Sequence, residues 1–246
     1  MISKVSWSST SQPVAVTSSS LPRWRGGAAT PDVAPPNGQA RRRLRTRAAL
    51  LGAGRELLVE GRTQASIEEI TQRAGVGFGT FYNHFESKEQ LFGGALFDVL
   101  DRYTDWLRSA TGELDDPAEI FAASFRLTGR LAAANPGLLA PLLASGTEVL
   151  LVERGLRVSA LEDLERGVAE GRFTAMRPDV LLMVVGGALL GLVRLLVTDP
   201  GSTSEDVIDD VAAAVLRMLG VSDADATAVV SRPVGDLPDL GTWLGE

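Results

Sequence analysis

Two helix-capping sequences flank one short stretch of this chain and constrain its fold more than any other feature. Ser66–Glu69 (SIEE) and Ser87–Gln90 (SKEQ) each place a serine three residues before a Glu or Gln. In such a capping box the serine hydroxyl accepts from the amide three residues on, and the Glu or Gln side chain reaches back. We therefore predict that one helix begins at Ser66 and that a long second helix begins at Ser87 and ends near Gly112.

The stretch between the two boxes has the pattern of two short helices joined by a turn. Ile67, Ile70 and Ala74 share one helical face, and Gly75 stands where a left-handed terminator belongs. A further short helix is predicted from Phe78 to His84. An apolar helix from Leu44 to Gly61 precedes them, and two short helices braced in this way form a helix-turn-helix.

The rest of the chain also reads as helix. Apolar residues recur at helical spacing, Gly and Pro separate the segments, and no window alternates like a half-buried strand. An apolar run of fourteen residues, 180–193, is shorter than the roughly 20 residues that span a bilayer, so we expect a buried helix there. The fold class is predicted to be all-α, with later helices near 117–133, 136–144, 147–170, 178–197 and 204–219.

Composition excludes most enzyme and metal chemistry. The 246 residues contain no cysteine and a single histidine, His84. Disulfides, thiolate metal sites and most His-dependent catalytic arrangements are thereby excluded. The carboxylates lie mainly on helix faces that read as solvated, so a small helical enzyme is the weaker alternative, and no catalytic residue, metal or cofactor is expected.

Charge divides the chain in two. The net charge is −7, yet residues 1–92 carry a balance of +5 and residues 93–246 one of −12. A basic first third followed by an acidic remainder is typical of one module that faces nucleic acid and another that does not, although chance asymmetry is the alternative.

Four segments follow from these patterns. Residues 1–40 are rich in Ser, Pro, Gly and Ala and are expected to form a disordered arm; they lack the apolar segment of a signal peptide. Residues 41–92 form the predicted DNA-binding domain, 93–220 a helical regulatory and dimerisation domain, and 221–246 a tail with a short helix at 223–230. The arginine-rich run 41–47 fits either a solvated arm or one that binds DNA, and Arg45 is taken as a candidate contact.

The second helix of the predicted motif carries the candidate DNA contacts. No acidic residue lies between Glu69 and Glu86. Small or apolar residues permit close approach to the bases, and hydroxyl, imidazole and ammonium groups suit phosphate oxygens. The base-facing candidates are Gly77, Phe78 and Thr80, and the phosphate contacts are Tyr82, His84 and Lys88. The alternatives are a half-buried core position for Tyr82, a helix cap for His84 and a solvated lysine for Lys88.

The segment Arg45–Phe92, above all TQASIEEITQRAGVGFGTFYNHFESKEQLF, resembles the DNA-binding domain of the TetR family of bacterial regulators. The resemblance implies that Tyr82, His84 and Lys88 contact phosphate and that Thr80 and Phe78 lie at the groove. It also implies a homodimer through the last two long helices, and a small-molecule inducer. Gly77 departs from the serine of many members, which leaves the base-reading set small.

The acidic domain is expected to dimerise and to bind a ligand. Gly187 and Gly191 lie within one apolar helix, and Val207, Val211 and Val215 follow helical spacing on the next. Such faces can form a four-helix bundle between two protomers, or pack within one protomer. Aromatic and polar side chains between them are pocket candidates, although ordinary core packing is the alternative: Trp106, Phe121, Phe125, Leu142 and Arg157.

The function predicted from these features is that of a cytoplasmic, nucleoid-associated transcriptional regulator that does not enter membranes. It binds operator DNA as a homodimer and acts as a repressor that a small molecule releases. The alternative is a helix-turn-helix protein that a protein partner controls.

Overall fold

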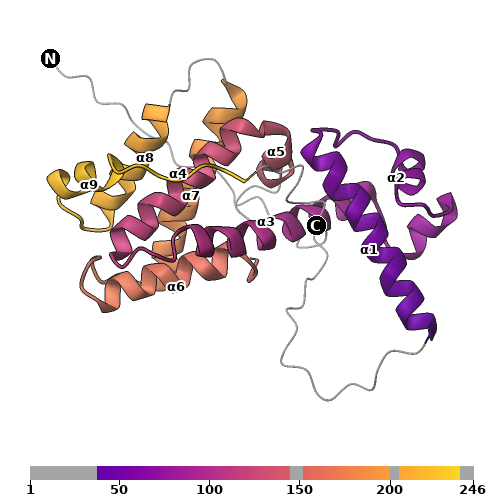
Figure 1. Ribbon diagram of the computed structural model, residues 1–246, viewed down its shortest axis with the longest axis horizontal. Helices are drawn as coiled ribbons and strands as arrows, with labels where there is room; N and C mark the ends of the chain where they lie inside the picture. Colours follow the sequence, from indigo (N-terminus) through magenta and orange to yellow (C-terminus); the bar gives the residue numbers. More distant parts are fainter. Residues whose placement is uncertain (1–37, 145–151, 200–204, 239–246) are drawn as a thin grey trace, which may run out of the picture. The chain divides into compact units, whose positions relative to one another are not determined.

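The computed structural model describes residues 38–144, 152–199 and 205–238, and within them it contains helices and no strand. The first four elements are α1 (Gly38–Val59), α2 (Ile67–Arg73), the 3-10 helix η1 (Phe78–Asn83) and α3 (Lys88–Ala110). Figure 1 labels the α-helices. The others are α4 (Pro117–Ala134), α5 (Pro136–Ala144), α6 (Leu156–Ala169), α7 (Pro178–Thr198), α8 (Glu205–Met218) and α9 (Asp223–Val230). The predicted all-α class is confirmed.

Both predicted helix starts carry the expected serine cap. The Ser66 hydroxyl accepts from the Glu69 amide at 3.1 Å, and the Ser87 hydroxyl accepts from the Gln90 amide at 3.2 Å. The reciprocal half of each box is different: the Glu69 side chain pairs with an arginine, and Gln90 Oε1 accepts from the amide one residue before the cap. Gly75 has φ +66°, in the left-handed region that ends α2 and turns the chain towards η1.

The helix α1 starts earlier than the sequence pattern predicted. We expected regular helix only from Leu44, and for the arginine-rich run 41–47 either a solvated arm or one that binds DNA. The helix begins at Gly38 and includes the whole run, because arginine is a good helix former and no breaker separates the run from the apolar segment after it. The rest of the expected arm lies outside the described residues.

The helix α3 joins the DNA-binding module to the rest of the domain. It begins next to η1 and runs for 23 residues. It packs closely on α1 where glycine removes a side chain: a Cβ at Gly54 would lie 3.2 Å from that of Ala95 on α3. Its further residues contact α5 and α6. The single helix α3 therefore forms part of both modules.

The predicted helix 147–170 is too long at its start. Residues 145–151 lie outside the described part of the chain, and Val152–Arg154 are not helical. Gly155 has φ +52°, and a Cβ there would lie 2.4 Å from Asp101 Oδ1 on α3. This left-handed glycine allows the chain to approach α3 closely before α6 begins.

The helical domain continues past residue 220, where we predicted the start of a tail. The predicted short helix is present as α9, and Ala226, Val229 and Val230 on it are buried. Arg126 on α4, only 5% exposed, forms a two-pronged ion pair with Asp209 of α8 and donates to the Arg232 carbonyl at 2.7 Å. These contacts fix α8 and the segment after α9 against α4.

The helix α7 has 21 residues and, by length and composition alone, is long and apolar enough to cross a membrane. Within the described chain, it packs against α4, α5, α6 and α8. Seven of its residues are buried by these contacts, in agreement with the expected core helix.

Candidate functional site

An exposed aromatic edge lies on η1. Phe78 and Tyr82 are 55% and 57% exposed, and their rings meet edge to face with centroids 6.1 Å apart. Phe81 and Phe85 point the other way and are 0% and 3% exposed. The inward pair holds η1 on the core, and the outward pair faces solvent. This position of Tyr82 differs from the half-buried alternative.

The backbone is exposed at the start of η1, because two glycines there carry no side chains. Gly77 and Gly79 are exposed, and a Cβ at Gly79 would meet nothing within 4 Å. Gly77 precedes η1 without a side-chain cap, and Thr80 beside it is half-buried. A surface of this kind allows a second molecule to approach the backbone closely.

His84 and Lys88 border the same edge and are both half-buried. Burial lowers the pKa of His84 below its ordinary value, and the charges of Arg43 and Arg47 on α1 lower it further. The imidazole is therefore biased towards its neutral form, which has one N–H to donate. Lys88 is the first residue of α3, where helix amides are also free.

Arg45, the arginine chosen from the run, is exposed on α1. Its neighbours Arg43 and Arg47 are the two whose charge reaches His84. Helix geometry turns about 100° per residue, so Arg45 points about 160–200° away from both. The structure thus brings Arg43 and Arg47 to the edge of η1, and it does not bring Arg45 there.

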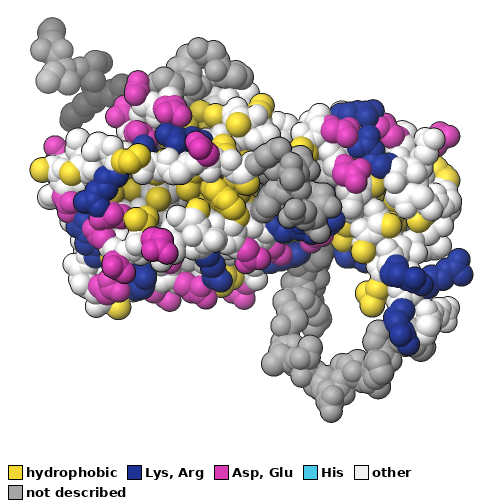
Figure 2. All heavy atoms as spheres, in the orientation of Figure 1, with side chains coloured by type: hydrophobic (Ala, Val, Ile, Leu, Met, Phe, Trp, Pro, Cys, Tyr) yellow, Lys and Arg dark blue, Asp and Glu magenta, His cyan; other side chains and the backbone are white. Residues whose placement is uncertain are grey.

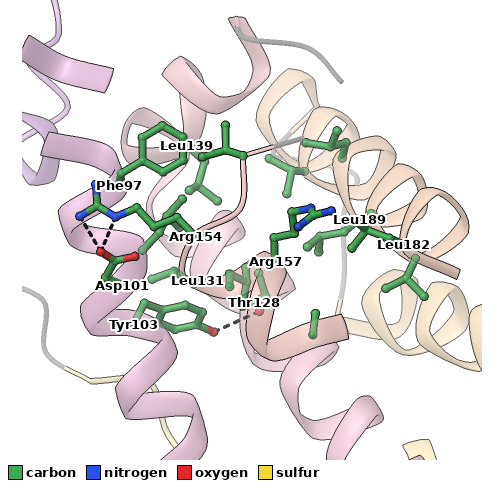
Figure 3. Close-up of a pocket in the computed structure, with 18 residues that line it drawn as sticks. Phe97, Asp101, Tyr103, Thr128, Leu131, Leu139, Arg154, Arg157, Leu182 and Leu189 are labelled. Carbon is green, nitrogen blue, oxygen red and sulfur yellow. Dashed lines mark hydrogen bonds and ion pairs between the residues drawn. The ribbon is translucent and has the colours of Figure 1, made fainter. Parts of the chain in front are cut away.

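A cavity of about 100 Å³ lies between α3, α4, α5, α6 and α7 (Figure 3). Its wall is mostly apolar, with leucines and valines from α7 and Phe97 and Leu100 from α3. The cavity is of the same order as one of about 150 Å³ that binds benzene, so its volume suits a ligand no larger than a single ring.

Polar groups reach this wall from α3, from α4, from α6 and from the segment just before α6. Tyr103 on α3 and Thr128 on α4 have their hydroxyls 3.3 Å apart. Because Thr128 donates to the Ser124 carbonyl at 2.7 Å, its oxygen accepts from Tyr103. Asp101 Oδ2 accepts from Arg154 at 2.6 Å, whereas its buried Oδ1 has no hydrogen-bond partner in the described part of the chain. In Figure 3 Arg154 lies over the α3 side of the cavity and Arg157 extends towards Leu189 on α7.

The expected pocket residues are mostly elsewhere. Arg157 lines the cavity, but Trp106, Phe121 and Phe125 do not. Trp106 stacks on Tyr103 with ring centroids 5.6 Å apart, and the two phenylalanines pack together in the core. The side chain of Leu142 lies outside what the structure describes. Asp101 and Arg154 were not predicted from the sequence; the available signal was the pair Asp98 and Asp101, one helical turn apart on an apolar helix.

Asp98 connects the cavity wall to α1. Its Oδ1 accepts from Arg154 at 2.9 Å, and its Oδ2 lies 3.3 Å from Arg55 of α1. The same Arg154 pairs with Asp101. A chain of four charges therefore runs from the cavity through α3 to the first helix of the DNA-binding module.

The residues expected at a dimer interface divide into two groups. Gly187 and Gly191 of α7 are exposed, and a Cβ on either would meet nothing within 4 Å. On α8, Val207 and Val211 are half-buried, while Val215 is 1% exposed. Val215 thus packs inside its own protomer, as the core alternative held. The exposed apolar stripe that remains on the two helices comprises Val180, Met183, Gly187, Gly191 and Leu195 of α7 and Met218 of α8.

Two family models match successive parts of this chain. Residues 50–95 match the bacterial regulatory proteins of the tetR family, and residues 116–232 match a Tetracyclin repressor-like C-terminal domain. The HTH-type transcriptional repressor KstR2 of Mycolicibacterium smegmatis is 38% identical over 69 residues, which are 26% of this chain and 34% of that protein. An uncharacterised HTH-type transcriptional regulator of Mycobacterium tuberculosis is 32% identical over 126 residues, 51% of this chain and 58% of the relative. The match thus spans between about a third and three fifths of these relatives.

Solved structures match over greater lengths. RolR in complex with its ligand resorcinol is 33% identical with a TM-score of 0.73, and the match covers 81% of this chain and all of RolR. RolR without ligand is 31% identical, with a TM-score of 0.66 and coverage of 78% and 100%. A match of this identity over the full length of a relative, together with the two family models, assigns the chain. It belongs to the TetR family of bacterial regulatory proteins.

Proposed function

We propose that this protein is a transcriptional repressor that binds operator DNA as a homodimer and is released by a small, single-ring effector. The observation that carries the proposal is the single helix α3, which begins at the exposed edge of η1 and forms a wall of the cavity. An effector in that cavity contacts α3, the helix that begins beside the exposed edge of η1.

The DNA side of the proposal rests on exposure and charge. Phe78 and Tyr82 are exposed apolar rings on a segment without acidic residues, and their exposure has no structural purpose within the protomer. Phe78 suits a thymine methyl, and the Tyr82 hydroxyl suits a phosphate oxygen. Lys88 adds a positive charge at the start of α3.

The proposal of a dimer is supported by the exposed apolar stripe of α7 and α8. Val180, Met183 and Leu195 are each about two-fifths exposed, and Met218 is 53% exposed. Exposed glycines between them allow two backbones to approach closely. A two-fold pairing of α7 and α8 with their copies buries this stripe in a four-helix bundle.

The chemistry of the cavity favours a hydroxylated ring. Its size matches one ring, well below the 300–1,000 Å³ of pockets for drug-sized ligands. The Asp101 carboxylate lines the cavity as an acceptor for a ligand hydroxyl, and Arg157 supplies donors. Resorcinol, the ligand of RolR, is a ring with two hydroxyls and is therefore the first probe to test.

The charge chain offers a route from effector to DNA. A ligand hydroxyl that binds Asp101 competes with Arg154 for that carboxylate, and Arg154 also holds Asp98. Asp98 in turn holds Arg55 on α1. We propose that loss of the Arg154 ion pairs moves α3 relative to α1 and so changes the distance between the η1 edges of the two protomers. Tight binding requires these two edges to lie about one duplex turn apart.

The experiment is a DNA-release assay with a matched pair of variants. Duplexes selected from a random pool by the purified protein are bound in the presence of resorcinol and of other single-ring phenols. We expect at least one of these phenols to weaken binding. Asp101→Asn should reduce this effect, and Asp105→Asn, an exposed position one turn further along α3, should not. If binding persists at every phenol concentration, control by this class of effector is wrong, and the alternative of a protein partner gains support.

A further inference from the structure

The first helix begins before the segment that matches the family model. The tetR-family model begins at residue 50, whereas α1 begins at Gly38. This extension carries five arginines within residues 41–47 and no acidic residue before Glu56. On the face shown in Figure 2, Lys and Arg side chains gather at this end of α1 without Asp or Glu beside them.

Helical register separates these arginines into different faces. Arg43 and Arg47 are four residues apart, so they lie on one side of α1, in line with the buried Leu50 and Gly54. The Arg47 guanidinium lies 5.2 Å from the centre of the Phe85 ring. Both arginines lie close enough to His84 for their charges to lower the pKa of its imidazole. They therefore flank the edge of η1 that carries Tyr82 and His84.

The charges of Arg43 and Arg47 are not neutralised within the described residues. No carboxylate there lies within ion-pair distance of either one. By contrast, Arg55, Arg62 and Arg73 in the same module each pair with Asp or Glu at 3.3 Å or less. Guanidinium groups without a carboxylate partner, beside a half-buried imidazole, form a site where one anion can contact several donors. The planar guanidinium matches the geometry of phosphate oxygens.

We propose that Arg43 and Arg47, together with His84, bind the phosphate backbone of the operator, so that the extension of α1 enlarges the DNA footprint beyond the helix-turn-helix. Arg45, on the opposite side of the helix, makes no such contact. This proposal rests on the proposed DNA-binding function. The occupant is duplex DNA because its phosphates complement the charge and because the surface is continuous with the exposed edge of η1.

The test compares two variants with the same change in charge. Wild type, Arg43→Ala and Arg45→Ala are titrated with the selected duplex by fluorescence anisotropy at several salt concentrations. Each phosphate contact contributes about 0.9 to the slope of log affinity against log salt, so a dimer that loses two should show a slope smaller by about 1.8. We expect this loss for Arg43→Ala and an unchanged slope for Arg45→Ala. An unchanged Arg43→Ala slope, or equal losses in both variants, overturns the proposal.

A phosphate scan then locates the contact. Single methylphosphonate substitutions remove the charge of one phosphate at a time. Neutralising the phosphate bound by Arg43 should lower the DNA affinity of wild type and of Arg45→Ala, but should not lower the affinity of Arg43→Ala any further. If every substituted phosphate lowered the affinity of Arg43→Ala as much as that of wild type, the assignment would be wrong. Equal thermal melting of the three proteins shows that the fold is unaffected. Failure of wild type to bind any duplex would refute the proposed function itself, whereas normal wild-type binding with an unaffected Arg43→Ala refutes only this extension.

Discussion

Replacing Gly187 with leucine should separate the stability of the protomer from that of the dimer. Gly187 is exposed on α7 in the middle of the apolar stripe, and a Cβ there would meet nothing within 4 Å of its own protomer. Within one protomer the change should be harmless, and it should raise helix stability by up to about 1 kcal/mol because leucine is the better helix former.

The cost should appear at the two-fold interface. A two-fold interface contains each substitution twice, and overpacking costs about 1–3 kcal/mol at each site. The expected loss is therefore about 2–6 kcal/mol of association free energy, or between about 30-fold and 20,000-fold in the dimer dissociation constant.

Sedimentation over a dilution series measures this constant, and circular dichroism follows the helix content. The matched control is Ala169→Leu, which adds similar bulk to an exposed position on α6. If Gly187→Leu dimerised as tightly as the control, the interface would lie elsewhere. If it lost helix content as a monomer, the reasoning about open space around Gly187 would be wrong.

Three further predictions follow from the contacts described above. Tyr82→Phe and Lys88→Ala should each weaken binding to all duplex sequences, because both groups are assigned to phosphate, and Lys88→Ala, which removes a charge, should also reduce the salt slope; an unchanged affinity in either variant, or an unchanged slope in Lys88→Ala, would remove that assignment. The pKa of His84, held low by burial and by Arg43 and Arg47, should rise in Arg43→Ala and stay constant in Arg45→Ala; proton NMR of this single histidine measures it, and equal shifts would contradict the register. Hydrogen bonds from Arg172 lower the pKa of Asp116 in the folded protein. The pair therefore stabilises the fold at pH values above the unfolded-state pKa of about 3.9, and this stabilisation is lost as the pH falls through the lower folded-state pKa. Asp116→Asn should flatten this part of the curve of melting temperature against pH, and an unchanged curve would exclude the pair as its cause.

The helix-turn-helix was predictable because its determinants are local. The capping serines, the left-handed Gly75 and the inward Phe81 and Phe85 lie within a few residues of the elements that they define. The start of α1 was not predictable in the same way, because the composition of the preceding residues obscured the high helix propensity of the arginines.

The cavity could not be derived from sequence because its wall comes from five helices. Asp101 and Arg154 are far apart in the chain and meet only because Gly155 lets the segment before α6 approach α3. The same limit applies to Val215, where helical spacing identified an apolar face but not whether it packs within the protomer or against another. Periodicity identifies a buried face, whereas tertiary structure determines which surface covers it.

The most direct test of the account is selection of duplexes from a random pool by the purified protein, followed by competition against unselected DNA. We expect an enriched, two-fold symmetric sequence bound at least about a thousandfold more tightly than random duplex, on the scale that separates specific from non-specific binding. We also expect that Phe78→Ala reduces this preference while leaving salt-dependent binding in place. Binding of equal strength to every sequence would contradict the claim that the exposed edge of η1 reads operator DNA.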